Sequence, residues 1–129
     1  MKSYTDLEQS KKLAEFLSIE SADGFYEAQH NPLTDKWEYI LFTGNKWASE
    51  EVVIPCWSLA ALLDQLEDVI YDEEDNQWEL VIKKEGVQYD LYYLTVYGEQ
   101  ENIELDRFYD DLIDCCYEMI LTLKEKDLL

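Results

Sequence analysis

A run of alternating apolar and polar side chains late in the chain constrains the fold more than any other feature. Alternate residues of Trp78–Ile82 are apolar, and the alternation resumes after Glu85-Gly86 through Val87–Tyr93. Two runs of period two joined by a short turn that contains glycine are typical of a β-hairpin. This segment therefore predicts an antiparallel sheet.

Three amphipathic segments predict helices around this sheet. Thr5 with Glu8 fits a capping box that opens a helix running to about Leu17. Ser58 is placed to cap a compact helix over Leu59–Leu66, and a stronger helical pattern closes the chain. The apolar face of this last helix comprises Phe108, Leu112, Cys115, Cys116, Met119, Ile120 and Leu123.

Shorter patterns fill the chain between these helices. Ser18–Gly24 predicts a break with one short turn, and Gly98–Asn102 a polar loop. Three strands are predicted: Trp37–Thr43 before a turn at Gly44-Asn45, Val52–Ile54 stopped by Pro55, and Ile103–Leu105. Too little chain remains for parallel crossovers. We therefore expect a single α+β domain over residues 1–129, in which an antiparallel sheet with a central hairpin packs against an N-terminal, a middle and a C-terminal helix.

The charge of the chain limits its partners. Thirty acidic residues against ten basic ones give a formal net charge of -20, yet 47% of the residues are hydrophobic and 14% aromatic. That apolar content is typical of a folded globule rather than of a disordered acidic tail. A charge of this sign repels nucleic acids and anionic membranes and attracts basic protein surfaces.

The sequence also predicts a compartment. The first residues include no apolar stretch of signal-peptide length, and no run approaches the roughly 20 apolar residues of a membrane span. Three cysteines, two of them adjacent, favour reduced thiols over a disulfide framework. We expect a cytoplasmic protein without disulfides.

Three segments resemble, as a set, an uncharacterised family of small acidic proteins from the genomes, prophages and mobile elements of Bacteroides-group bacteria. They are residues 10–15 with Ser21–Asp23, the run Pro55–Leu63 that begins Pro-Cys-Trp-Ser-Leu, and residues 108–120 with the ending Lys124–Leu129. The resemblance implies a bacterial, phage or mobile-element origin. It implies no activity and transfers no functional residue.

Candidate chemistry in the sequence is sparse. A Cys56–His30 dyad would need a third, orienting group, and Cys56 is better explained as a small buried hydrophobe. Cys115 and Cys116 point about 100° apart on a helix and suit no shared metal. The acidic loop Asp72–Asn76 lacks the glycine and glutamate of a calcium loop. We therefore expect no catalytic residue, cofactor or metal.

The carboxylates of the last helix are the candidate partner contacts. Asp110, Asp114 and Glu118 follow i, i+4 spacing with Asp111 beside them, a ridge that suits a basic surface but that solubility and the helix dipole also explain. We expect a non-enzymatic acidic protein-interaction module. The alternative is a nucleic-acid mimic that inhibits a DNA- or RNA-handling defence enzyme, which would require the acids to gather on one elongated face.

Overall fold

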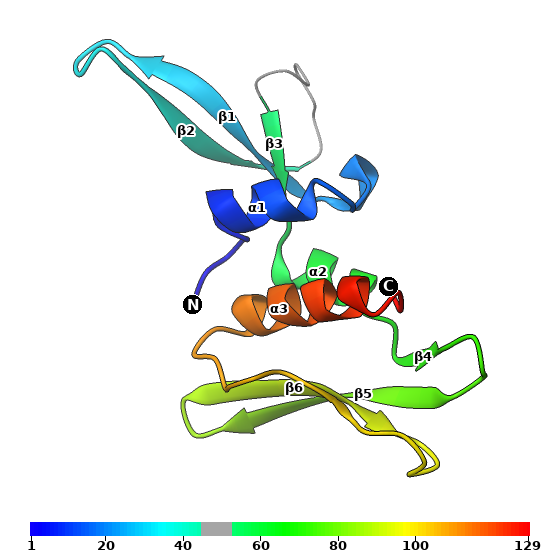
Figure 1. The fold of residues 1–129 in the computed structure, drawn as a ribbon. Coiled ribbons are helices and arrows are strands. Elements are labelled where there is room, and N and C mark those ends of the chain that lie inside the picture. The colour runs from blue at the N-terminus through cyan, green and yellow to red at the C-terminus, as the bar shows by residue number, and fades with distance from the viewer. Residues whose placement is uncertain (45–52) are drawn as a thin grey trace. The chain divides into compact units, whose positions relative to one another are not determined.

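The computed structural model describes residues 1–44 and 53–129 and has an α+β fold, as the sequence predicts (Figure 1). The chain divides into two compact units, one formed by residues 3–61 and the other by residues 62–129 together with Met1 and Lys2. The sequence predicts one sheet, whereas the described residues form two, one in each unit.

The unit of residues 3–61 contains a three-stranded antiparallel sheet in the order β2-β1-β3. The central strand β1, which the sequence did not predict, pairs with β2 on one side and with β3 on the other. The break predicted after the first helix holds a short 3-10 turn. The elements are α1 (Leu7–Leu13), η1 (Ile19–Ser21), β1 (Gly24–Asn31), β2 (Lys36–Thr43), β3 (Val53–Cys56) and α2 (Leu59–Gln65), which continues into the other unit.

The first helix begins one residue later than predicted, and its cap is Asp6 rather than Thr5. The Gln9 backbone N–H donates to Asp6 Oδ1 over 2.8 Å, and the Asp6 N–H donates to Gln9 Oε1 over 3.1 Å, which completes a capping box. The helix ends at Leu13 rather than near Leu17.

Thr5 is fully buried because it joins the helix to the end of β3. Its hydroxyl lies 2.7 Å from Ser10 Oγ and accepts the Trp57 backbone N–H over 3.1 Å, while its own N–H donates to the Trp57 carbonyl. A threonine with these partners cannot also cap the helix.

Pro55 lies inside β3 and does not stop it, contrary to the sequence prediction. It pairs with Phe25 in an edge strand, where a residue without an N–H is tolerated. Trp57 follows, fully buried, and donates from Nε1 to Ser21 Oγ over 2.9 Å. Ser58 caps α2 as predicted, because its hydroxyl accepts the backbone N–H of Ala61, the third residue of the helix, over 3.2 Å. Val52 and Asn45, which the sequence assigns to a strand and a turn, lie outside the described residues.

The other unit contains a four-stranded antiparallel sheet in the order β4-β5-β6-β7. The predicted hairpin is confirmed as β5 and β6, with Gly86 at a φ of 63° in the turn. The last helix packs on this sheet through β6, as predicted. The elements are β4 (Val69–Tyr71), β5 (Gln77–Glu85), β6 (Gln88–Thr95), β7 (Ile103–Glu104) and α3 (Leu112–Glu125).

The buried face of α3 agrees with the predicted apolar face except at its start. Phe108 lies before the helix and is 48% exposed, Leu112 is half-buried, and Ile113, which was not predicted, is buried. The predicted face places the helix start too early, since Asp111 is the N-cap. The buried helix residues are Ile113, Cys115, Cys116, Met119, Ile120 and Leu123.

Candidate functional site

The four carboxylates predicted to contact a partner do not form one ridge. Asp110 lies before the helix and is exposed, and its Oδ1 accepts a hydrogen bond from Gln88 Nε2 over 3.2 Å. Asp111 is buried, with 8% of its surface exposed, and caps α3 by accepting the Ile113 N–H over 2.9 Å. The Asp111 carboxylate is therefore used inside the fold, and the structure gives it a capping role that the sequence did not predict.

Lys2 contacts two of these carboxylates, those of Asp111 and Asp114. Its backbone N–H donates to Asp111 Oδ2 over 2.6 Å, and its ammonium lies 2.7 Å from Asp114 Oδ1. Asp114 is therefore neutralised by an ion pair whose partners are about one third exposed. These contacts attach the start of the chain to α3, and the lysine ammonium offsets the charge of one of the four carboxylates that the sequence assigns to a partner.

Glu118 is a half-buried residue of α3. Burial raises the pKa of its carboxyl, the negative charge of Asp106 adds to the rise, and the nearby Arg107 opposes it. The Arg107 guanidinium in turn lies 4.6 Å from the centre of the Tyr109 ring. Among the four predicted contacts, only Asp110 and Glu118 keep a carboxylate that neither caps the helix nor pairs with Lys2.

The structure separates the two residues of the candidate dyad. Cys56 pairs with Gly24 at the start of β1, whereas His30 lies six residues further along that strand, about 20 Å away at the usual rise per residue. His30 Nε2 lies 2.9 Å from Asp35 Oδ1 instead. Burial, followed by the charge of Asp23, raises the pKa of the Cys56 thiol to about 12. Such a thiol is protonated near neutral pH and is a poor nucleophile.

The other two thiols have the same character. Burial raises the pKa of Cys115 to about 11 and that of Cys116 to about 12. All three cysteines are free and buried in the described part of the chain. Their environment is that of packed core residues rather than of reactive thiolates.

The acidic loop before β5 is closed by its own hydrogen bonds. Asp72 Oδ1 accepts the backbone N–H groups of Glu74 and Asn76 over 2.9 Å each, and Oδ2 accepts Asn76 Nδ2 over 2.8 Å. The hydrogen bond from the Asn76 side chain lowers the pKa of Asp72. Within residues 1–44 and 53–129, no group of three or more His, Cys, Asp or Glu side chains is arranged to hold a metal ion.

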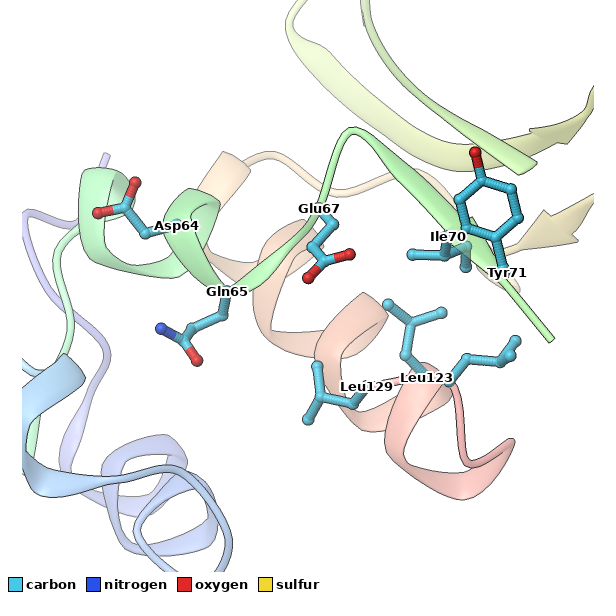
Figure 2. Close-up of a pocket in the computed structure, with 8 residues that line it drawn as sticks. Asp64, Gln65, Glu67, Ile70, Tyr71, Leu123 and Leu129 are labelled. Atoms are coloured by element: carbon cyan, nitrogen blue, oxygen red, sulfur yellow. The ribbon is translucent and has the colours of Figure 1, made fainter. Parts of the chain in front are cut away.

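The described residues enclose a hollow at the end of α3 that the sequence did not indicate. It has a volume of about 400 Å³, and Figure 2 shows the side chains around it: Asp64 and Gln65 from α2, Glu67 after it, Ile70 and Tyr71 from β4, and Leu123 and Leu129 from the end of the chain. Leu128 completes the lining.

Two kinds of side chain meet in this hollow. Ile70 and Leu123 are buried, with 4% and 1% of their surface exposed, and give it an apolar floor. Asp64 and Glu67 are exposed residues of the lining, and Figure 2 shows the Glu67 carboxylate directed toward Leu123 and Leu129 and the Asp64 carboxylate directed away from them. A second hollow of about 660 Å³ adjoins it and shares Tyr71 and Leu128. It adds the carboxylates of the acidic loop and of Asp127, together with one ammonium group, that of Lys126. The arrangement suits a ligand that is apolar along its length and positively charged at its end.

Comparisons with protein-family models, with curated proteins and with solved structures found no match for this chain. None of the helices in the described residues has both the length and the apolar composition to cross a membrane.

Proposed function

We propose that this protein is a non-enzymatic interaction module that binds a basic segment of another protein in the hollow beside the end of α3. The observation that carries the proposal is the apolar floor of Ile70 and Leu123 beside the carboxylate of Glu67, in a hollow that the exposed Asp64 also lines. A lysine or arginine side chain has the matching form, because its methylene stem packs on apolar surface while its charged head stays near the rim.

The distribution of charge supports this choice of partner. The unit that contains the hollow has twenty acidic and six basic side chains, which give a formal charge of -14. Residues 3–61 have ten acidic and four basic side chains, which give a formal charge of -6. The stronger negative field thus surrounds the hollow. Such a field accelerates the approach of a cationic partner and weakens as salt rises.

A charge-matched pair of variants tests the proposal. The first carries Asp64→Asn and Glu67→Gln at the rim of the hollow. The control carries Glu85→Gln and Glu99→Gln, which remove the same charge from two exposed positions of the same unit that do not line the hollow. Each protein is immobilised and presented with lysate of the organism that encodes it, and retained proteins are identified after elution at rising salt.

A basic protein retained by the wild type and by the control, and lost from the rim variant, would support the proposal. Its purified form should then bind the rim variant at least about tenfold more weakly, a loss of ~1.4 kcal/mol. Equal retention by both variants would contradict the hollow as the binding site. Competition by DNA or RNA for the retained protein would favour a nucleic-acid mimic instead.

A further inference from the structure

The edge strand β2 exposes a stripe of large apolar side chains. β1 pairs with one side of β2, and within the described residues no strand pairs with its other side. Trp37 is 71% exposed, Tyr39 45% and Leu41 40%. The three residues alternate along the strand, so their side chains lie on one face of the sheet. Figure 1 shows the hairpin of β1 and β2 extending beyond α1.

The backbone of the same three residues faces the open edge. The Gly44 N–H donates to the Asp23 carbonyl over 2.8 Å, which makes that pair a hydrogen-bonded one. Hydrogen-bonded and non-hydrogen-bonded pairs alternate along an antiparallel ladder. The pairs that Trp37, Tyr39 and Leu41 form with residues of β1 are therefore the non-hydrogen-bonded ones. Their N–H and C=O groups therefore point away from β1 and can accept another strand.

Among residues 1–44 and 53–129, few of the common features that block such pairing are present at β2. It is eight residues long, contains no proline and has one lysine, Lys36, at its first position. Natural edge strands are usually short, charged, bulged or covered. A long, regular, apolar edge strand is the form that strand addition uses.

We propose that β2 pairs antiparallel with β2 of a second copy of this chain, with Tyr39 opposite its own counterpart on the two-fold axis. This register keeps each outward-facing residue in a hydrogen-bonded pair. It also places Trp37 of each copy opposite Leu41 of the other, so that apolar side chains meet along the whole stripe. The proposal concerns a different unit from the basic-partner hollow and does not depend on it.

Local charge favours a second copy as the occupant. The segment Lys36–Thr43 contains one lysine and one glutamate, Glu38, and is therefore formally neutral in a chain of charge -20. None of the three stripe residues is itself charged, and the ammonium of Lys11, which lies 5.7 Å from the centre of the Tyr39 ring, is the charged group that the structure places against the stripe. Repulsion then arises only from the rest of the two molecules, where salt screens it beyond about 8 Å. Dimerisation should strengthen as salt rises, whereas binding of a basic partner should weaken.

Sedimentation equilibrium of the full chain, from low to high micromolar concentration and at low and high salt, tests the pairing. The wild type should show a monomer–dimer equilibrium that salt shifts toward the dimer. Tyr39→Lys should weaken the dimer at least about tenfold, because it places like charges directly opposite each other. Tyr97→Lys is the control, since Tyr97 is 71% exposed and lies outside β2.

A cysteine scan tests the register and does not rely on the lysine variant folding. Tyr39→Cys should form an intermolecular disulfide under mild oxidation, because residues facing each other across a hydrogen-bonded pair lie about 5.5 Å apart at Cα. Ile40→Cys, 39% exposed and on the opposite face, should not. A chain that stays monomeric under all conditions, a dimer that Tyr39→Lys leaves intact, or equal crosslinking by both cysteines would overturn the proposal.

Discussion

Replacing Asp111 should destabilise the fold rather than disturb partner binding. Its carboxylate caps α3 at the Ile113 N–H and also accepts the Lys2 N–H over 2.6 Å, in a position that is 8% exposed. Loss of an N-cap side chain costs about 0.5–2 kcal/mol, and a hydrogen bond to a charged group contributes about 1.5–3 kcal/mol. Because the Lys2 N–H can return to water, we expect Asp111→Ala to lower the free energy of unfolding by about 2–3 kcal/mol.

Thermal and urea denaturation followed by circular dichroism measure this loss. For a chain of this length, 1 kcal/mol corresponds to about 3–5 °C in Tm, so the expected shift is about 6–15 °C. Asp110→Ala is the matched control, because the exposed Asp110 accepts one 3.2 Å bond from Gln88. It should change the free energy of unfolding by less than about 0.5 kcal/mol.

A third variant separates the cap from the charge. Asp111→Asn keeps an oxygen that caps a helix almost as well as aspartate, and it should lose less than half as much stability as Asp111→Ala. If Asp111→Ala and Asp110→Ala lowered Tm equally, the assignment of Asp111 to the fold would be refuted, and its role as a surface contact would return.

Three further predictions concern packing inside each of the two units. Gly24→Ala should lower the free energy of unfolding by about 1–3 kcal/mol in urea titration, because a Cβ there would lie 2.7 Å from Tyr4 Cε1 and 2.9 Å from Cys56 Sγ. Tyr93→Phe should lower it by about 1 kcal/mol, because the phenol donates to the Glu67 carbonyl over 2.7 Å; an unchanged midpoint would contradict this. Burial raises the pKa values of the three thiols from 9.0 to about 11–12, so the folded state favours their protonated form. This contribution to stability is complete below pH 9 and should be lost as pH rises from 9 to 12. The urea midpoint measured at increasing pH tests it.

The sequence predicted the elements whose patterns are local. The hairpin of β5 and β6 and the helix α3 carry strong periodicities of two and 3.6 residues, and both were found. The strand β1 was missed because its sequence begins with glycine and ends in polar residues, and it forms by pairing with β2 and β3 on either side. Strand formation depends on such neighbours more than on intrinsic propensity. Because β1 was not predicted, the strands that pair with it could not be recognised as a sheet separate from that of β5 and β6.

The candidate site was predicted less well because it depends on contacts between distant residues. The spacing of the acids on α3 did not reveal that the helix starts after Asp111, nor that Lys2 would reach two of the carboxylates from the other end of the sequence. The hollow joins the end of α2, β4 and the end of α3, three segments that no sequence pattern connects. The proposal of a basic partner follows from the net charge, whereas only the fold shows that Ile70 and Leu123 form an apolar floor beside the Glu67 carboxylate.

The two proposed contacts can be separated because they respond to charge in opposite ways. Removing Asp64 and Glu67 charges weakens attraction to a basic partner, yet it also lowers the repulsion between two copies of a chain of charge -20. The control with Glu85→Gln and Glu99→Gln lowers that repulsion by the same number of charges. Both variants should therefore dimerise slightly more tightly than the wild type and to a similar extent at low salt, a difference that high salt removes. Partner binding should distinguish the two variants, because it depends on where the charges lie as well as on how many there are.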